Sequence, residues 1–288
     1  EMARILNQLS FKATLDGDTL RAVVPDFRED IEGEADLSEE VLRIYGYEHI
    51  KSTMLRGETS TGTRNVHMQL ADRVGRILSA KGLYEIRNFS FVSPKLLDQL
   101  RLSADDARRH QMRLLNPLGE DAAVMRPTLA CGMLHTLAFN MNHSTPAARL
   151  YEMAAVFDHH HRTDEGLPTE TQTLCLGAYG PEEDFFTVKG ALEALAAGFG
   201  LTFDYQRETA AWLHPGISAA VYCNGKRLGV FGKLANEINA ELEIAKEQKD
   251  SQNIYLGELD YEALMSCVEG ELRYKPLSPY APVKRDLA

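Results

Sequence analysis

Four of the carboxylates near the start of the chain are spaced so that they could hold a metal ion. They are Asp30, Asp36, Glu39 and Glu40. Leu37, Val41 and Ile44 recur at the helical period, which predicts a helix opening at Asp36 with its acids along one edge of the first turn. Unpaired carboxylates at this spacing repel one another. A hard divalent cation such as Mg²⁺, which binds carboxylate oxygens and keeps several waters, would relieve the repulsion.

A helix cap explains the same acids without a metal. Asp36 followed three residues later by Glu39 has the spacing of a capping box, in which side chains accept hydrogen bonds from the amides of the first turn. Acids in a first turn are also stabilised by the helix dipole. The spacing alone leaves both a metal site and a helix cap open.

The stretch around these acids, residues 24–50 (VPDFREDIEGEADLSEEVLRIYGYEHI), resembles the beta subunit of bacterial phenylalanyl-tRNA synthetase. The resemblance is carried by Val24-Pro25, by Arg28 with Asp30-Ile31, and by the ending RIYGY at residues 43–47. It implies a magnesium ion shared with the alpha subunit and bound by the four acids named above, and all four positions hold an acid here.

Five further segments follow the same family in order and spacing. They lie at residues 82–94, 114–143, 149–157, 184–196 and 213–234. The resemblance implies an α+β fold with a small helix-rich, winged or helix-turn-helix-like module at 1–55 and a linker at 56–65. A class II aminoacyl-tRNA synthetase-like antiparallel sheet flanked by helices would occupy 66–272. Residues 273–288 look like the start of a ferredoxin-like anticodon-binding module, so we expect the chain to be part of a longer protein.

Local patterns predict the elements of the larger domain. Apolar periodicity stops over residues 51–65, where Ser, Thr and Gly accumulate, and a helix follows with a stop at Gly82. Alternation predicts a strand over residues 86–91. Asn224-Gly225 is the strongest hairpin signal, and helices are expected at 129–140, 188–198 and 235–244.

The helix after residue 65 is a candidate interface. Its apolar face consists of Leu70, Val74, Ile77 and Leu78. A long helix followed by a strand resembles the first motif of class II synthetases, which packs subunit against subunit. We therefore expect this face, with Phe89 and Phe91, to be partly an interface with the alpha subunit in an alpha2-beta2 assembly. An isolated chain would expose the face, and a homodimer is then expected.

The chain lacks the arginines that adenylate formation requires. Phosphates and a pyrophosphate leaving group need cationic side chains aimed at the developing negative charge. In the expected second motif, residues 149–157, the family's usual Gly-Arg pair is Ala154-Ala155, and in the expected third motif, residues 229–238, only Lys233 is basic. We therefore predict no catalytic and no cofactor-binding residues, with ATP used by the holoenzyme and tRNA bound through it.

Composition favours a scaffold rather than a separate nucleic-acid binder. The net charge of −11 over 288 residues argues against a broad phosphate-binding surface. No apolar run approaches a membrane span, and four cysteines far apart in sequence suggest reduced thiols and a cytoplasmic protein. The consecutive histidines at 159–161 are expected in a solvated turn. An autonomous class II ATP-dependent ligase and a nucleic-acid-binding module remain the alternatives.

Overall fold

The computed structural model describes residues 1–162, 166–242, 253–268, 280 and 285, without the side chains of residues 159–162. The chain divides into two compact units, Glu1–Thr63 and Arg64–Ala288, and each is described by itself. The division falls within the stretch 56–65 that the sequence predicts as a linker. The predicted module start at 273–288 lies outside the described residues, apart from Tyr280 and Arg285.

The first unit is a small α+β arrangement. It contains α1 (Met2–Gln8), β1 (Lys12–Asp16), β2 (Thr19–Val23), α2 (Glu34–Tyr45) and the 3-10 helix η1 (Tyr47–His49). β1 and β2 form an antiparallel hairpin, and Gly17 occupies the left-handed region in its turn. The core is formed by Ile5 and Leu6 of α1, Phe11 beside the hairpin and Val41 of α2. This core is small, so polar contacts carry more weight in this unit than in the second.

The second unit is built on a seven-stranded sheet. Its elements in chain order are α3 (Val66–Ala80), β3 (Tyr84–Glu85), β4 (Phe91–Val92), η2 (Pro94–Leu100), η3 (Ala107–Arg109), η4 (Glu120–Ala122), β5 (Val124–Met125), α4 (Ala130–Asn142), β6 (Ala148–Arg162), β7 (Pro168–Tyr179), α5 (Phe185–Gly198), β8 (Asp204–Gln206), β9 (Leu213–Cys223), β10 (Lys226–Leu234), α6 (Asn236–Glu241), β11 (Ile254–Asp260) and α8 (Tyr261–Met265). The strand order is β3-β6-β7-β11-β10-β9-β8, antiparallel except for the parallel pair β3–β6. The fold is therefore α+β.

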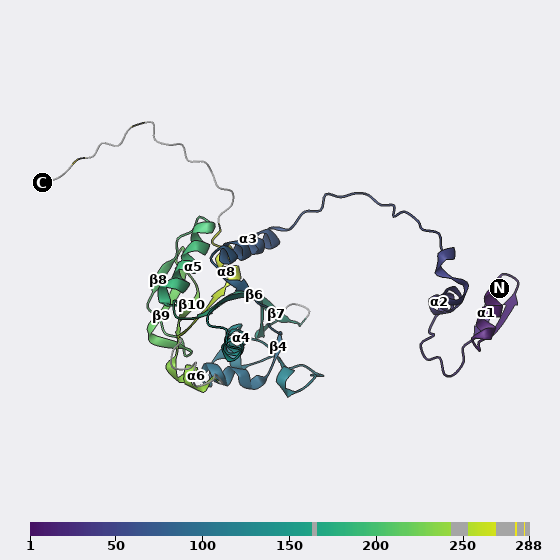
Figure 1. Ribbon diagram of the computed structural model, residues 1–288, viewed down its shortest axis with the longest axis horizontal. Coiled ribbons are helices and arrows are strands. Elements are labelled where there is room, and N and C mark those ends of the chain that lie inside the picture. Colours follow the sequence, from purple (N-terminus) through teal and green to yellow (C-terminus); the bar gives the residue numbers. More distant parts are fainter. Residues whose placement is uncertain (163–165, 243–252, 269–279, 281–284, 286–288) are drawn as a thin grey trace. The chain divides into compact units, whose positions relative to one another are not determined.

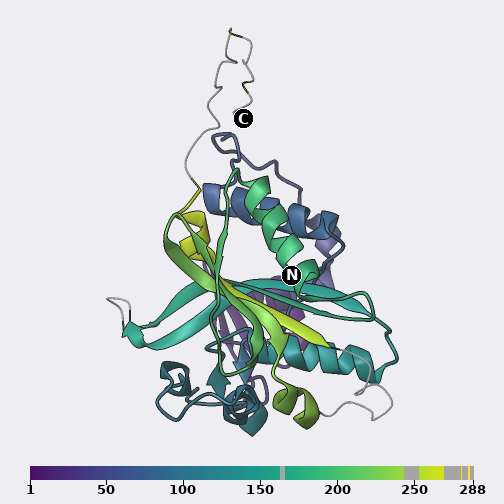
Figure 2. The ribbon, with the colours of Figure 1, turned by 90° about the vertical axis from the view of Figure 1, so that its left-hand side faces the viewer.

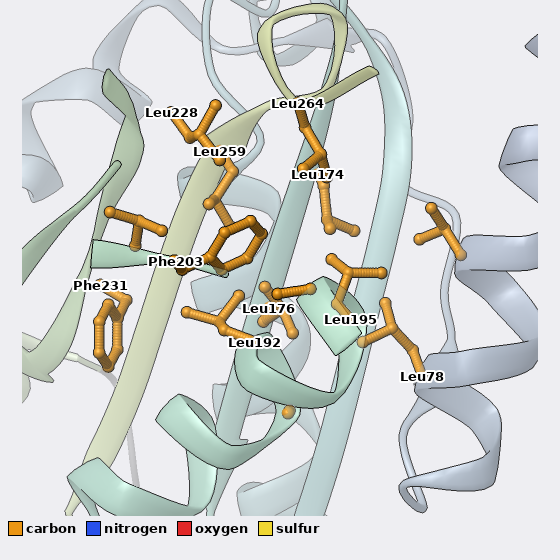
Figure 3. Close-up of a cluster of buried hydrophobic side chains, with 14 of the residues drawn as sticks. Leu78, Leu174, Leu176, Leu192, Leu195, Phe203, Leu228, Phe231, Leu259 and Leu264 are labelled. Carbon is orange, nitrogen blue, oxygen red and sulfur yellow. The ribbon is translucent and has the colours of Figure 1, made fainter. Parts of the chain in front are cut away.

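Helices cover both faces of this sheet. Figures 1 and 2 show α3, α5 and α8 on one face and α4 and α6 on the other. The core under the first group includes Leu78 of α3, Leu195 of α5 and Leu264 of α8, with Leu174 and Leu259 from the strands (Figure 3). Because side chains alternate along a strand, the neighbouring strand positions form the second core against α4 and α6. Within the described residues, no helix is both long enough and apolar enough to span a bilayer.

Several predicted elements are confirmed, and their boundaries shift by a few residues. The helix expected after residue 65 is α3, and those expected at 129–140 and 188–198 are α4 and α5. The helix expected at 235–244 ends at Glu241. Asn224-Gly225 joins β9 to β10, and both residues have positive φ, as a two-residue hairpin turn requires.

Two predictions of local structure are wrong. Of the strand expected over residues 86–91, only Phe91 is in a strand: β3 ends at Glu85 and β4 begins at Phe91. Between them the backbone N–H of Asn88 donates to the Glu152 carboxylate instead of to a neighbouring strand. The histidines at 159–161 lie in the long strand β6 and not in a turn. Pairing of β6 with β7 carries the strand beyond the apolar segment in which its sequence pattern is visible.

The interface expected on α3 is also corrected in part. Val74 and Leu78 are fully buried in the core of the second unit, whereas Leu70 and Ile77 are only partly buried. Phe89 and Phe91 do lie at the surface. The buried half of the α3 face belongs to the domain core because α5 packs against it, and the sequence of α3 does not show which face its own chain covers.

Leu78→Ala should lower the free energy of unfolding of the second unit by about 3 kcal/mol, since it removes a fully buried side chain and leaves a cavity. Phe89→Ala is the matched control: its ring is 89% exposed, and the change should stay within about 0.5 kcal/mol. Chemical denaturation followed by circular dichroism measures both. Equal destabilisation by the two substitutions would contradict this assignment of core and surface.

Candidate functional site

Arg28 joins two of the four acids in the first unit. Its Nη2 lies 2.7 Å from Oδ2 of Asp30, and its Nη1 lies 2.9 Å from Oε2 of Glu40. Arg43, one helical turn after Glu40, donates from Nη2 to the same Oε2 at 2.7 Å. The Glu40 side chain is only 8% exposed, so its charge is balanced by two guanidinium groups and not by water.

Asp36 and Glu39 have different roles from Glu40. The helix α2 begins at Glu34, which places Asp36 third in the helix and not at its cap. Oδ2 of Asp36 accepts hydrogen bonds from the backbone amides of Glu32 and Gly33, at 2.9 and 2.8 Å. Glu39 is exposed. The predicted capping role of an acid is therefore found, but Asp36 acts from within the helix, and the predicted Asp36–Glu39 box is wrong.

The arrangement in the first unit does not fit a divalent cation as it stands. Among the described residues, no group of three or more His, Cys, Asp or Glu side chains is placed to hold a metal ion. Asp30 and Glu40 both accept hydrogen bonds from Arg28, so a cation between them would lie against a guanidinium group. Sequence reasoning missed this role of Arg28. A local signal existed only for the partner Arg43, whose three-residue spacing from Glu40 is typical of helical ion pairs.

The ion pairs shift the acidity of their carboxyl groups. Hydrogen bonds from Arg28, and then from Arg43, lower the pKa of Glu40 to about 2. The hydrogen bond from Arg28 also lowers the pKa of Asp30. Both carboxylates therefore remain ionised through the whole neutral range, and they stabilise the folded unit only while ionised.

A cleft of about 470 Å³ lies on the sheet of the second unit, on the face that α4 covers. Its two arginines are already paired: Arg108 donates to Asp106 at 2.7 Å, and Arg227 donates to Glu208 at 2.6 Å. Glu258 at the cleft accepts from Thr128 Oγ1 and from the backbone amide of Leu129, both at 2.7 Å, at the start of α4. Further acids, Asp158 and Asp260, also line the cleft, which makes it a poor site for a polyphosphate.

The basic residues expected in the second and third motifs do not line this cleft. Arg149 precedes Val156 by an odd number of positions on β6, so the two side chains emerge on opposite faces of the sheet. Arg149 pairs with the buried Glu183 near α5, with Nε 2.6 Å from Oε1. Lys233 of β10 is not among the residues of the cleft. The tertiary structure thus directs Arg149 into a structural ion pair.

A buried network surrounds Glu152 in the first half of β6. Its Oε1 accepts from Arg126 Nη1 and from the backbone amide of Asn88, both at 2.9 Å, and its Oε2 accepts from Asn88 Nδ2 at 2.8 Å. Thr136 of α4 donates to Asn88 Oδ1 at 2.9 Å. The network fixes the backbone at Asn88, and the next residue, Phe89, is directed to the surface.

The surface beside this network exposes large apolar side chains. Tyr84, Phe89 and Phe91 are 74%, 89% and 45% exposed, and Leu115 and Leu118 in the following loop are almost fully exposed. Two backbone hydrogen bonds hold that loop beside β4. The amide of Ala123 donates to the carbonyl of Val92, and the amide of Met125 donates to the carbonyl of Met112. Large exposed apolar side chains on ordered segments are typical of a protein interface.

Glu40→Gln should lower the stability of the first unit by about 2 kcal/mol at pH 7, because it leaves Arg28 and Arg43 without their buried partner. The folded pKa is lowered, so the stabilisation is complete above the unfolded value of 4.5 and disappears as the pH falls towards about 2. Hydrogen exchange of the amides of α2 measures both effects in the whole chain. If wild type and variant lose protection in parallel between pH 5 and pH 2, Glu40 does not carry this contribution.

Comparisons with known proteins agree over the whole chain. The family model of the phenylalanyl tRNA synthetase beta chain CLM domain matches residues 50–261, and that of the tRNA synthetase B5 domain matches residues 1–47. Two similar relatives are the phenylalanine–tRNA ligase beta subunits of Clostridium tetani and Carboxydothermus hydrogenoformans. Each is 34% identical to this chain, and each match covers 100% of the chain. The chain spans 36% of the length of each of these relatives. It belongs to the family of phenylalanine–tRNA ligase beta subunits.

Proposed function

We propose that this chain is a structural, non-catalytic part of the beta subunit of phenylalanine–tRNA ligase, which charges tRNA(Phe) with phenylalanine at the expense of ATP. The matched relatives carry the name of that subunit over the full length of the chain. In this proposal the alpha subunit forms the adenylate, and the present segment supports it within an alpha2-beta2 assembly in the cytoplasm. Transfer RNA is bound through the holoenzyme.

The main support for the non-catalytic assignment is that the arginines of the sheet cleft are already paired with carboxylates. An adenylate-forming site keeps cationic side chains available for phosphate oxygens. Here Arg108 and Arg227 are paired with carboxylates of the same domain, and Arg149 lies on the other face of the sheet. The antiparallel sheet with helices on both faces supports a class II synthetase-like fold without the charges that ATP chemistry uses. This argues against an autonomous ligase.

The aromatic surface around Phe89 supports a protein partner. It combines Tyr84, Phe89 and Phe91 with the two exposed leucines of the neighbouring loop. The half-buried Leu70 and Ile77 line a shallow groove on α3 together with Arg73 and Arg76. We assign these surfaces to contact with the alpha subunit, and in the isolated chain to homodimerisation. The acidic balance of the chain disfavours the alternative of a nucleic-acid-binding module.

Capture of the purified alpha subunit tests the proposal. The chain should bind the alpha subunit, and by itself it should give no phenylalanine-dependent exchange between ATP and pyrophosphate. Phe89→Ser should weaken capture at least tenfold without lowering the melting temperature, since the ring is exposed. Glu170→Gln, an exposed change on β7, is the control. Exchange by the chain alone above a heat-denatured sample would contradict the scaffold function, and undiminished capture by Phe89→Ser would contradict the surface.

Magnesium binding at Asp30, Asp36, Glu39 and Glu40 stays a prediction from the resemblance. It requires Asp30 and Glu40 to exchange the Arg28 guanidinium for the cation, because both now accept hydrogen bonds from it. We propose that the alpha subunit drives this exchange by adding ligands, since Mg²⁺ is usually held by few protein groups and retains water.

Paramagnetic broadening by Mn²⁺ measures this binding with and without the alpha subunit. Signals of α2 should broaden at lower Mn²⁺ concentration in the complex. Arg28→Gln should increase the affinity of the isolated chain several-fold, because it removes the competing cation. Arg21→Gln serves as the control, since that arginine is exposed and its Nε lies 3.9 Å from Oδ2 of Asp16, which is not one of the four acids. Absence of broadening near α2 in the complex would contradict the magnesium site and leave Asp30, Asp36 and Glu40 with their structural hydrogen bonds alone.

A further inference from the structure

Two cysteines from distant parts of the second unit meet at one end of the sheet. Cys223 is the last residue of β9, and Cys267 follows α8, 44 positions later. Sγ of Cys267 lies 3.6 Å from the carbonyl oxygen of Cys223 and 3.4 Å from that of Ala263. Both cysteines are free and buried. The fold therefore holds two thiols together that the sequence separates.

The two side chains also belong to one buried cluster, and the neighbouring Cys267 contributes to the raised pKa of the Cys223 thiol. A disulfide requires Cβ atoms roughly 3.5–4.5 Å apart and a sulfur–sulfur bond of about 2 Å, and the 3.6 Å contact between Cys267 Sγ and the backbone of Cys223 places the two residues side by side. We propose that Cys223 and Cys267 form a modification site, in which a peroxide or a diazene oxidant converts the two thiols into an intramolecular disulfide.

The reaction balances with either class of oxidant. With a peroxide, one thiolate attacks an O–O oxygen and becomes a sulfenic acid, while the other oxygen leaves as water after protonation. The second thiolate then attacks the sulfenic sulfur and releases a second water. With a diazene such as diamide, the first thiolate adds to the N=N bond, and the second displaces the hydrazine. In both cases two thiols lose two protons and two electrons.

The surroundings of the pair make this reaction slow and selective. Burial, followed by the hydrogen bond from Cys267, raises the pKa of the Cys223 thiol to about 11, so little thiolate is present at neutral pH. Cys267 is 5% exposed, and it follows the C-cap of α8, a helix of only five residues. Opening of this short helix is the route by which an oxidant reaches Cys267, and it costs less than global unfolding.

The bond would attach α8 to the β9–β10 hairpin. At present α8 is held by Asp260, which accepts from the backbone amide of Ala263 at 2.8 Å, and by Tyr261, whose hydroxyl donates to the carbonyl of His67 in α3 at 3.4 Å. Lys226 of β10 also donates to Ser266 at 2.9 Å. A covalent link that closes a loop of this length restricts the unfolded chain and stabilises the native domain.

Treatment of the whole chain with diamide, followed by alkylation and peptide mass spectrometry without reduction, tests the proposal. We expect a cross-link between the peptides of Cys223 and Cys267 and a rise in melting temperature of roughly 5–10 °C that dithiothreitol reverses. Cys131 and Cys175 provide an internal comparison. They are also buried and near enough to influence each other, but Cys131 Sγ donates to the carbonyl of Leu96 and Cys175 Sγ to that of Leu176, whereas Cys267 Sγ contacts the residue of its proposed partner. They should stay unlinked.

Two variants make the result decisive. Cys267→Ser should abolish both the cross-link and the thermal shift, and its hydroxyl retains the ability to donate to the carbonyl of Cys223. Cys131→Ser should keep both. Alkylation of Cys223 after oxidation and denaturation, or its recovery in a link with Cys131 or Cys175, would overturn the proposal. The assay involves neither the alpha subunit nor aminoacylation, so its failure is independent of the proposed function.

Discussion

The carboxylate of Glu152 is the constraint on which the second unit depends. It is 1% exposed, and burying an ionised carboxylate is unfavourable unless its charge and lone pairs are satisfied. Arg126 supplies the charge, and Asn88 supplies two hydrogen bonds. Because these partners come from two separate loops, the stability of β6 is coupled to the positions of both. The buried network therefore also fixes the backbone position of the exposed aromatic residues next to Asn88.

Charge satisfaction within the domain also explains why the sheet cleft suits a scaffold. A site for ATP leaves cations available for a ligand, at a cost to the stability of the unliganded protein. In this chain the cleft arginines are paired, and Glu258 accepts hydrogen bonds at the start of α4. The same groups that would repel a polyphosphate hold α4 and the neighbouring loops on the sheet. In this proposal, the same ion pairs stabilise the domain and leave the cleft without cations for ATP.

The first unit follows a related logic with a smaller core. Few apolar side chains are buried there, and Glu40 with Arg28 and Arg43 joins the loop before α2 to the helix. An isolated carboxylate cluster would repel itself, and Arg28 and Arg43 relieve that repulsion by pairing with Asp30 and Glu40. Asp30, Asp36 and Glu40 therefore have a structural role in the free chain. A magnesium ion would have to compete with this arrangement.

The sequence by itself determined the family, the α+β class, the main helices and the Asn224-Gly225 hairpin, because these follow from local periodicity, turn chemistry and ordered motifs. It also located the four acids, though not their partners. Only the tertiary structure decided that Val74 and Leu78 belong to the core, that Arg149 faces away from the cleft, and that Asn88 interrupts a predicted strand. It also decided that Cys223 meets Cys267. These outcomes depend on contacts between residues far apart in the chain, where burial and charge pairing outweigh the preferences of a local segment.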